Sequence, residues 1–271
     1  DDDLLVIDKP SGIVVNRSDT TKEEETVADW AEEKLKIKNL KLKINGDGQP
    51  AENLELEFVN RGGIVHRLDK ETSGILLIAK NPKSFLNLQL QFKERKVEKI
   101  YIALVHGLVK PETGEINVPV GRLSFNRKRF GIVAGGREAV TKYKVLRYLE
   151  VRNGRWDTES LTSRNRDIKK SSSRTSHFTL LELYPKTGRT HQIRVHLKYF
   201  GHPVFSDPLY GGRKSSREDR KLLPRLFLHA SEISFQHPKT NKIISLESPL
   251  PKELEDLMSK FEAQPAGSTL K

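Results

Sequence analysis

Short apolar segments that end at turn residues recur along the whole chain, and few of them are long enough to be helices. "GILLIAK" at 74–80, "YIALVHG" at 101–107 and "HFTLLELYP" at 177–185 are examples. Runs of this length, rich in Ile, Leu, Val and aromatic residues and bounded by Gly, Pro or Asn, are typical of β-strands. Many such runs with a few helices between them predict an α+β fold, with a mixed, largely antiparallel central sheet flanked by helices and loops.

Helical spacing of apolar residues is seen in a few places, and the clearest helix start is Asn81 followed by Pro82. We expect helices over residues 26–37, 82–95, 190–200 and 251–262. In addition to the strands above, we expect two strands around a Pro-Ser-Gly turn at 4–15 and one strand at 63–69.

The chain of 271 residues is long enough to bury a substantial core. We expect a single domain over residues 1–262, with a loop at 38–62, a basic, Ser-rich insertion at 152–175 and a disordered tail at 263–271. The absence of cysteine excludes disulfides and thiolate metal sites and indicates a cytoplasmic protein. No apolar run is long enough to span a membrane.

Positive charge is concentrated in the middle of the chain. The net charge is +12, and residues 121–175 hold fifteen Lys and Arg against five Asp and Glu, an excess of +10. One explanation of this cluster is a basic surface that is simply exposed to solvent. Clustered basic charge is also what a phosphate backbone attracts, so we favour a nucleic-acid partner.

One carboxylate stands out in the stretch "HRLDKETSGILLIAK". Asp69 lies between Arg67 and Lys70, just before the apolar run at 74–80. A nearby cation holds a carboxylate ionised even when it is partly buried, and an ionised, partly desolvated carboxylate suits nucleophilic catalysis. The structural alternative is an ion pair at the end of a strand, with Asp69 accepting backbone N–H bonds in the turn.

Other chemistries fit this stretch less well. "DKETSG" resembles the aspartate turn of Mg²⁺-dependent phosphate-transferring enzymes, but a Glu is interposed and no later acidic pair supplies the metal. "HRLD" differs from a kinase catalytic loop by one residue, and no Gly-rich phosphate loop precedes it. His191 and His196 are five residues apart, which places them on different faces of either a helix or a strand, so they are not a ligand pair.

Six segments in order resemble the RluA-type family of pseudouridine synthases over residues 4–248. These segments are "DKPSGIVV", "HRLDKETSGILLIAK", "YIALVHG", "TGRTHQIRVHL", "GHPVFSDPLYGG" and "LHASEISFQHP". The resemblance implies that Asp69 is the nucleophile that isomerises uridine in RNA to pseudouridine, without cofactor or metal. It also implies that Tyr101 stacks near the target base and that Arg194 pairs with Asp69, which we expect to be a bidentate ion pair. Arg67 would fill the space of the uridine, which must be flipped out of its helix.

The same resemblance, together with the basic charge, leads to a set of expected RNA contacts. These residues are His66, Arg67, Arg127, Lys128, Arg129, Arg189, Thr190, His191 and Gln192. Leu68, Ile193 and Val195 are candidates for the apolar walls of the base pocket, while Thr190 also has a structural reading as the cap of the following helix.

The resemblance leaves the substrate and the route open. Large-subunit ribosomal RNA is the favoured substrate and transfer RNA the alternative, and we expect a monomer that binds neither metal nor membrane. Attack at C1′ of the ribose, attack at C6 of the base and proton removal from C2′ would all use the same aspartate. A catalytically inactive RNA-binding protein on the same fold is the alternative function.

Two segments depart from the family pattern. No small N-terminal RNA-binding domain precedes the first catalytic strand, so we expect a member that lacks it or a trimmed chain, with the basic insertion supplying part of the RNA contact. Ser206 stands where the family more often has glycine.

Overall fold

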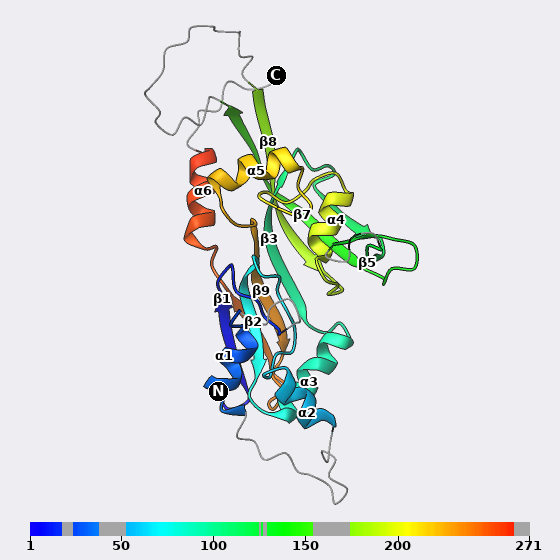
Figure 1. Cartoon of the computed structure of the whole chain (residues 1–271), viewed down its shortest axis with the longest axis vertical. Helices are drawn as coiled ribbons and strands as arrows, with labels where there is room; N and C mark the ends of the chain where they lie inside the picture. Colours follow the sequence, from blue (N-terminus) through cyan, green and yellow to red (C-terminus); the bar gives the residue numbers. More distant parts are fainter. Residues whose placement is uncertain (18–23, 38–52, 125, 127–128, 154–173, 263–271) are drawn as a thin grey trace, which may run out of the picture.

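The core of the protein is one mixed sheet that runs along the long axis of the molecule (Figure 1). The computed structural model describes residues 1–17, 24–37, 53–124, 126, 129–153 and 174–262. Seven strands follow in the order β1-β2-β9-β3-β8-β7-β4, and β10 pairs with β9. Every pair in this sheet is antiparallel except β2 with β9, which confirms the predicted α+β class and the largely antiparallel sheet. The strands of this sheet are β1 (Leu4–Lys9), β2 (Ser73–Ala79), β3 (Glu98–His106), β4 (Thr113–Asn117), β7 (Val140–Asn153), β8 (Arg174–Pro185), β9 (Leu228–Gln236) and β10 (Ile243–Glu247), and a separate pair is formed by β5 (Val120–Arg122) and β6 (Phe130–Ile132).

Helices cover the sheet at both ends of the molecule. In Figure 1, α1, α2 and α3 lie around β1 and β2 in the lower half, whereas α4, α5 and α6 lie around β7 and β8 in the upper half. Asn81 begins α3 as predicted, because its side chain accepts a hydrogen bond from the backbone N–H of Ser84 at 2.9 Å. The helices are α1 (Val27–Lys34), α2 (Asn53–Asn60), α3 (Pro82–Lys93), α4 (Gln192–Tyr199), α5 (Arg213–Leu222) and α6 (Lys252–Glu262).

The two faces of β2 belong to different core clusters. Ile75 and Leu77 pack in the cluster that contains Phe85 of α3, while Leu76 and Ile78 pack with residues of α1. All seven residues of β2 are therefore buried, as the continuous apolar run indicates. In the upper half, β3 and β8 are covered in the same way by α4 on one face and α6 on the other.

Three expectations about local structure were wrong. Residues 63–69 form a single bridge, Ile64 to Ile78, and no strand, because the backbones of Gly62 and Gly63 are both left-handed and turn the chain. Residues 12–15 follow the first turn without forming a strand. Within the expected loop at 38–62, residues 53–60 form α2, which Phe58 anchors by packing edge-on against Phe85.

The remaining expectations concern the basic insertion at 152–175, the tail at 263–271 and the helix α5. β7 and β8 extend into the expected insertion at both of its ends, up to Asn153 and from Arg174, while 154–173 and the tail 263–271 lie outside the described residues. α5 was not predicted, because its sequence is polar on every side. No helix in the described ranges is long and apolar enough to cross a membrane.

Candidate active site

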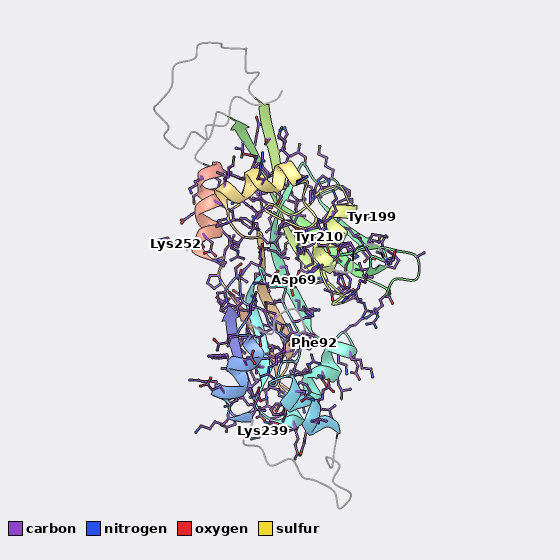
Figure 2. All side chains as sticks on the ribbon, viewed as in Figure 1. Asp69, Phe92, Tyr199, Tyr210, Lys239 and Lys252 are labelled. Carbon is purple, nitrogen blue, oxygen red and sulfur yellow. The ribbon has the colours of Figure 1, made fainter. Side chains whose placement is uncertain are left out.

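Asp69 lies near the middle of the molecule, in the turn that leads into β2 (Figure 2). Its backbone carbonyl accepts the N–H of Thr72 at 3.1 Å. Lys9, at the end of β1, is fully buried and donates to the carbonyls of Pro10, Ile13 and Lys70 at 2.8, 3.0 and 3.1 Å. Burial and the charge of Arg225 lower the pKa of Lys9 to about 8, and Asp69 opposes this shift. The turn that carries Asp69 is therefore fixed to the first strand by a buried amine.

Arg194 of α4 pairs with Asp69, as the resemblance implies. Its Nη1 donates to Oδ2 of Asp69 at 3.1 Å, across 125 residues of sequence. The bidentate pair, however, is made with Asp207: Nε and Nη2 donate to its two carboxylate oxygens, both at 2.9 Å. Burial opposes the charge of Arg194, but the hydrogen bonds and charges of Asp207 and Asp69 outweigh it and raise its pKa further. The expected bidentate pair with Asp69 is thus corrected to a single hydrogen bond.

The neighbours of Asp69 in sequence do not supply the cation beside it. Lys70 pairs instead with Glu24 on the surface, at 2.8 Å. Arg67 is exposed and lines the cleft described below. The cation beside Asp69 is therefore Arg194, whose side chain is 7% exposed against 16% for Asp69.

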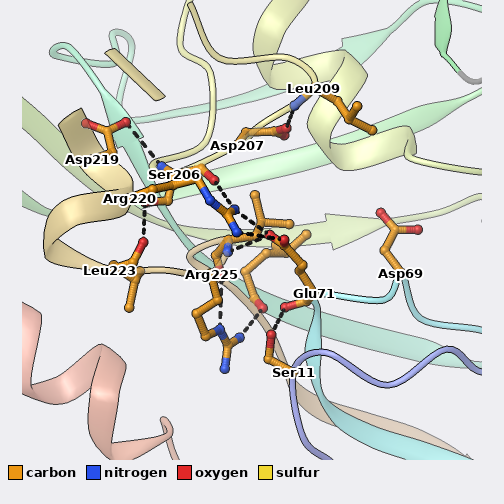
Figure 3. Close-up of polar contacts among 12 residues, drawn as sticks. Ser11, Asp69, Glu71, Ser206, Asp207, Leu209, Asp219, Arg220, Leu223 and Arg225 are labelled. Atoms are coloured by element: carbon orange, nitrogen blue, oxygen red, sulfur yellow. Dashed lines mark hydrogen bonds and ion pairs between the residues drawn. The ribbon is translucent and has the colours of Figure 1, made fainter. Parts of the chain in front are cut away.

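A second ion pair fixes the Asp69 turn to the loop that carries Asp207. Arg220 of α5 donates to both carboxylate oxygens of Glu71, at 3.0 and 3.1 Å, and to the carbonyl of Ser206 at 3.3 Å. Figure 3 shows Arg220 between Ser206 and Glu71, with Asp69 beside them. Ser206 has a left-handed backbone (φ 61°), which explains why glycine suits this position. Its hydroxyl donates to the carbonyl of Leu223 at 2.7 Å, which anchors the serine in that conformation.

Tyr101 of β3 lies in the wall of the same cleft. Its ring packs against two core clusters, the one that contains Ala103 and Val105 and the one that contains Leu76 and Ile78. Burial, and then the charge of Asp69, raise the pKa of its phenol well above the usual value. Tyr101 is therefore neutral and offers an aromatic face with a hydroxyl near the carboxylate.

The segment before α4 is fixed by Gln192. Its Oε1 accepts from the N–H of Arg189 at 3.0 Å and from the hydroxyl of Thr187 at 2.6 Å. Its Nε2 donates to the carbonyl of Val140 and to Oγ1 of Thr141, both at 3.0 Å. The amide is buried and saturated, so Gln192 positions the loop, which differs from the RNA contact expected for it.

His66 also has a structural environment. Its Nε2 accepts the N–H of Leu77 at 3.0 Å, and its ring stacks on Phe92 with centroids 4.7 Å apart. Burial and the charges of Lys99 and Arg61 lower its pKa to about 3, so the ring is neutral at physiological pH. His66 contributes a ring to the cleft wall, and its Nε2 already has a hydrogen-bond partner within the protein.

These side chains surround a cleft of about 570 Å³. Nine predicted site residues line it: His66, Arg67, Asp69, Tyr101, Arg189, Thr190, His191, Gln192 and Arg194. Leu68 and Ile193 line it as expected, whereas Val195 packs elsewhere, with Val120, Ala139 and Tyr210. Arg129 is exposed at the start of β6 and is not part of the lining, and Arg127 and Lys128 lie outside the described residues.

The charge of the cleft is one-sided. Among its lining residues Asp69 is the single acid, and eight are basic. The basic residues are Arg61, Arg67, Lys93, Arg95, Lys99, Lys186, Arg189 and Arg194. Such a surface attracts phosphates and surrounds one carboxylate.

Possible metal ligands lie elsewhere. In the described part of the chain, the ligand atoms of Asp1, Asp3 and His237 lie within 4.8 Å of one another. Asp3 already accepts from Asn81 and Ser84, at 3.1 and 3.0 Å, and none of the three possible ligands lines the cleft.

Sequence reasoning missed Asp207 and Tyr210, neither of which is part of the cleft lining. Asp207 holds Arg194 by two hydrogen bonds, and the hydroxyl of Tyr210 contacts Nδ1 of His191. Both lie in "GHPVFSDPLYGG", a segment used only for the resemblance. The available signal was a lone carboxylate, Asp207, in a segment that is otherwise free of charged side chains. The N-cap residue of α4 is His191, which makes no side-chain cap hydrogen bond, so Thr190 is not the cap of this helix.

Comparisons with known proteins agree with this geometry. Residues 3–199 match the family model described as RNA pseudouridylate synthase. An uncharacterized RNA pseudouridine synthase of Bacillus subtilis is 33% identical over 96% of this chain and 71% of its own length. A ribosomal large subunit pseudouridine synthase D of Nitrosomonas europaea is 34% identical over 99% of this chain and 65% of its own length. The human protein RNA Pseudouridylate Synthase Domain Containing 4 shares the fold, with a TM-score of 0.62 and 24% identity over 97% of this chain and 91% of its own.

Proposed function

The chain belongs to the RNA pseudouridylate synthase family, whose members are isomerases, and we propose that it converts uridines of large-subunit ribosomal RNA to pseudouridine with Asp69 as the reactive group. The observation that carries this proposal is the single carboxylate in a cleft otherwise lined by eight basic residues. A cleft built only to hold phosphates would gain nothing from a carboxylate inside it. Asp69 is nevertheless fixed there by Arg194.

The state of Asp69 suits the reaction. Arg194 donates a hydrogen bond to Oδ2 of the carboxylate, and the other oxygen, Oδ1, is 3.9 Å from Nε2 of His191, beyond hydrogen-bond length. The carboxylate promotes cleavage of the bond between ribose C1′ and uracil N1. The freed base turns within the cleft, a new bond joins C1′ to C5, and the C5 proton is released while N1 gains one. The product is an isomer, so no oxidant, reductant or co-substrate is consumed.

The cleft also fits an extruded nucleotide. Uridine inside a helix cannot reach Asp69, so it must be flipped out, at a cost of a few kcal/mol. A volume of about 570 Å³ lies within the range of pockets that enclose small molecules. Tyr101 offers an aromatic surface for the base. The exposed Arg67 would occupy the position that the uridine leaves, and the basic rim would hold the neighbouring phosphates.

The choice of RNA rests on the relatives. Two proteins named ribosomal large subunit pseudouridine synthase D, from Nitrosomonas europaea and Neisseria meningitidis, are 34% and 35% identical to nearly the whole chain. We therefore favour large-subunit ribosomal RNA over transfer RNA. Such a substrate agrees with the cytoplasmic location that the lack of cysteine indicates.

Tritium release from RNA labelled at uridine C5 tests the activity directly, since isomerisation must expel the C5 hydrogen. Wild type, Asp69→Asn and the control Asp256→Asn, which removes an exposed carboxylate on α6, are compared in EDTA. We expect release by wild type and the control and none by Asp69→Asn, and sequencing of the modified RNA then identifies the target. Tight RNA binding without release by wild type would favour a non-catalytic RNA-binding protein, and loss of release in EDTA would contradict the metal-free reaction.

A further inference from the structure

His191 has an unusual backbone at the start of α4. It is left-handed (φ 56°, ψ 19°), although it is not a glycine, and its side chain does not cap the helix. Such conformations cost free energy and persist where the surrounding structure enforces them, often at functional sites. Here the imidazole is held edge-on between Phe130 of β6 and Tyr210, with ring centroids 5.6 Å away on each side.

The hydroxyl of Tyr210 contacts one nitrogen of His191. That hydroxyl accepts the backbone N–H of Phe130 at 3.1 Å and lies 2.8 Å from Nδ1 of His191. Because the hydroxyl already accepts from Phe130, we infer that it directs its own proton to Nδ1. In a neutral imidazole with Nδ1 as acceptor, the proton is on Nε2.

The protonated Nε2 faces the reactive carboxylate. It lies 3.9 Å from Oδ1 of Asp69, and both residues line the cleft. Burial lowers the pKa of His191; Asp69 opposes this shift and Arg194 reinforces it, so the ring is neutral near pH 7. The two groups are too far apart for a direct hydrogen bond, which leaves the donor available to an oxygen of a bound nucleotide.

We propose that His191 is a catalytic residue, whose Nε2–H donates to a carbonyl oxygen of the extruded uracil and stabilises the negative charge that the base acquires as its bond to C1′ breaks. This inference rests on the proposed function. His191 keeps its proton throughout, while the electron pair of the broken bond is delocalised over the base. A preorganised donor aimed at developing charge is worth more than the same hydrogen bond in water.

Tyr210 is the positioning residue of this arrangement. It is 7% exposed and is not part of the cleft lining, so it acts on the substrate only through other residues. The guanidinium carbon of Arg194 lies over its ring, 5.0 Å from the centroid. One side chain therefore supports both donors that face Asp69: its hydroxyl fixes the tautomer of His191, and its ring supports Arg194.

The tautomer can be tested in the free protein. We expect ¹⁵N NMR of the full chain to show the His191 imidazole, assigned with His191→Asn, protonated at Nε2 and hydrogen-bonded at Nδ1. Tyr210→Phe should shift the Nδ1 signal, and the control Tyr199→Phe, which alters an exposed tyrosine on α4, should not. A proton on Nδ1 in wild type would overturn the assignment.

The catalytic role is tested by tritium release at saturating RNA. Asn tolerates the left-handed backbone but is too short to reach the position of Nε2, so we expect His191→Asn to lower kcat by about 100-fold with little change in KM. Gln reaches that position and should restore a large part of the rate. Tyr210→Phe should lower kcat by about 3- to 10-fold, the range that one ordinary hydrogen bond supplies.

The outcomes separate this inference from the proposed function. A normal wild-type rate that His191→Asn leaves within about twofold would overturn the role of His191 alone. A wild type that releases no tritium from any RNA would overturn the proposed function and the catalytic role together, while the NMR experiment would still decide the tautomer.

Discussion

Replacing Asp207 with Asn should destabilise the whole fold, although Asp207 is not part of the cleft lining. The Asp207 side chain is fully buried and holds Arg194, which is 7% exposed. The amide oxygen of Asn can still accept from the N–H groups of Leu209 and Tyr210, which now bond Oδ1 at 2.9 and 3.0 Å. The amide nitrogen, however, would face Nε–H of Arg194, so that a donor meets a donor.

The expected magnitude follows from the buried charge that loses its partner. Removing one member of a buried ion pair costs about 3–5 kcal/mol. Arg194 keeps its bond to Asp69, so we expect the lower end, about 3 kcal/mol. For a chain of this size, that corresponds to a fall in Tm of roughly 6–12 °C. Asp256→Asn, the exposed control on α6, should change the free energy of unfolding by less than about 0.5 kcal/mol.

Acid provides the sharper assay. Burial alone would raise the pKa of Asp207, but the hydrogen bonds and charge of Arg194 outweigh it and keep the pKa below its usual value. A carboxylate with a lowered pKa in the folded state stabilises the fold above its unfolded pKa, near 3.9, and loses that contribution as the pH falls through the folded pKa. In urea titrations, the difference between wild type and Asp207→Asn should therefore be constant from pH 7 to 5 and shrink below about pH 4. A difference under 1 kcal/mol at pH 7, or one that is unchanged at pH 3.5, would refute this reasoning.

Two further predictions concern the cleft. The pKa of His66 is about 3 in the folded protein and near 6.5 in the unfolded chain, so only the unfolded chain binds a proton there as the pH drops from 6.5 towards 4, and the free energy of unfolding should fall. In urea titrations, His66→Leu should make the free energy of unfolding depend less steeply on pH over this range. An unchanged pH dependence would contradict the prediction. Arg67→Ala should weaken RNA binding and reduce the slope of log K against log salt by about 0.7–0.9, whereas Lys260→Ala, an exposed cation of α6 outside the cleft lining, should leave the slope unchanged.

The sequence was most informative where burial is continuous. β2 and β3 were predicted because their apolar runs are packed on both faces, and α3 because Asn81 and Pro82 mark its start. α5 has no apolar stripe: its buried Asp219 accepts from the backbone N–H of Ser206 and bonds His106 at 2.8 Å. Those contacts are made between segments distant in sequence, so local periodicity does not reveal them.

The site residues also differ in how far the sequence revealed them. Asp69 was singled out by its own surroundings, and its pairing with Arg194 came from the resemblance, because nothing local connects residues 125 positions apart. Asp207 and Tyr210 were missed because they carry no recognisable catalytic pattern. Asp207 matters because it contacts Arg194, and Tyr210 because it contacts His191, and only the folded chain shows those contacts.

The correction to the Arg194 pairing bears on the reaction that we propose for Asp69. A bidentate pair with Arg194 would occupy both oxygens of Asp69 and stabilise the charge on which the proposed reaction depends. Because Asp207 takes two of the guanidinium N–H groups, Asp69 receives one hydrogen bond, at 3.1 Å on Oδ2. Asp69 therefore lies in the cationic cleft with one hydrogen bond from Arg194, while Asp207 holds Arg194 from outside the cleft lining. That arrangement leaves Oδ1 of Asp69 available for the proposed reaction, so the buried Asp207 allows a single arginine to hold Asp69 in place without binding both of its oxygens.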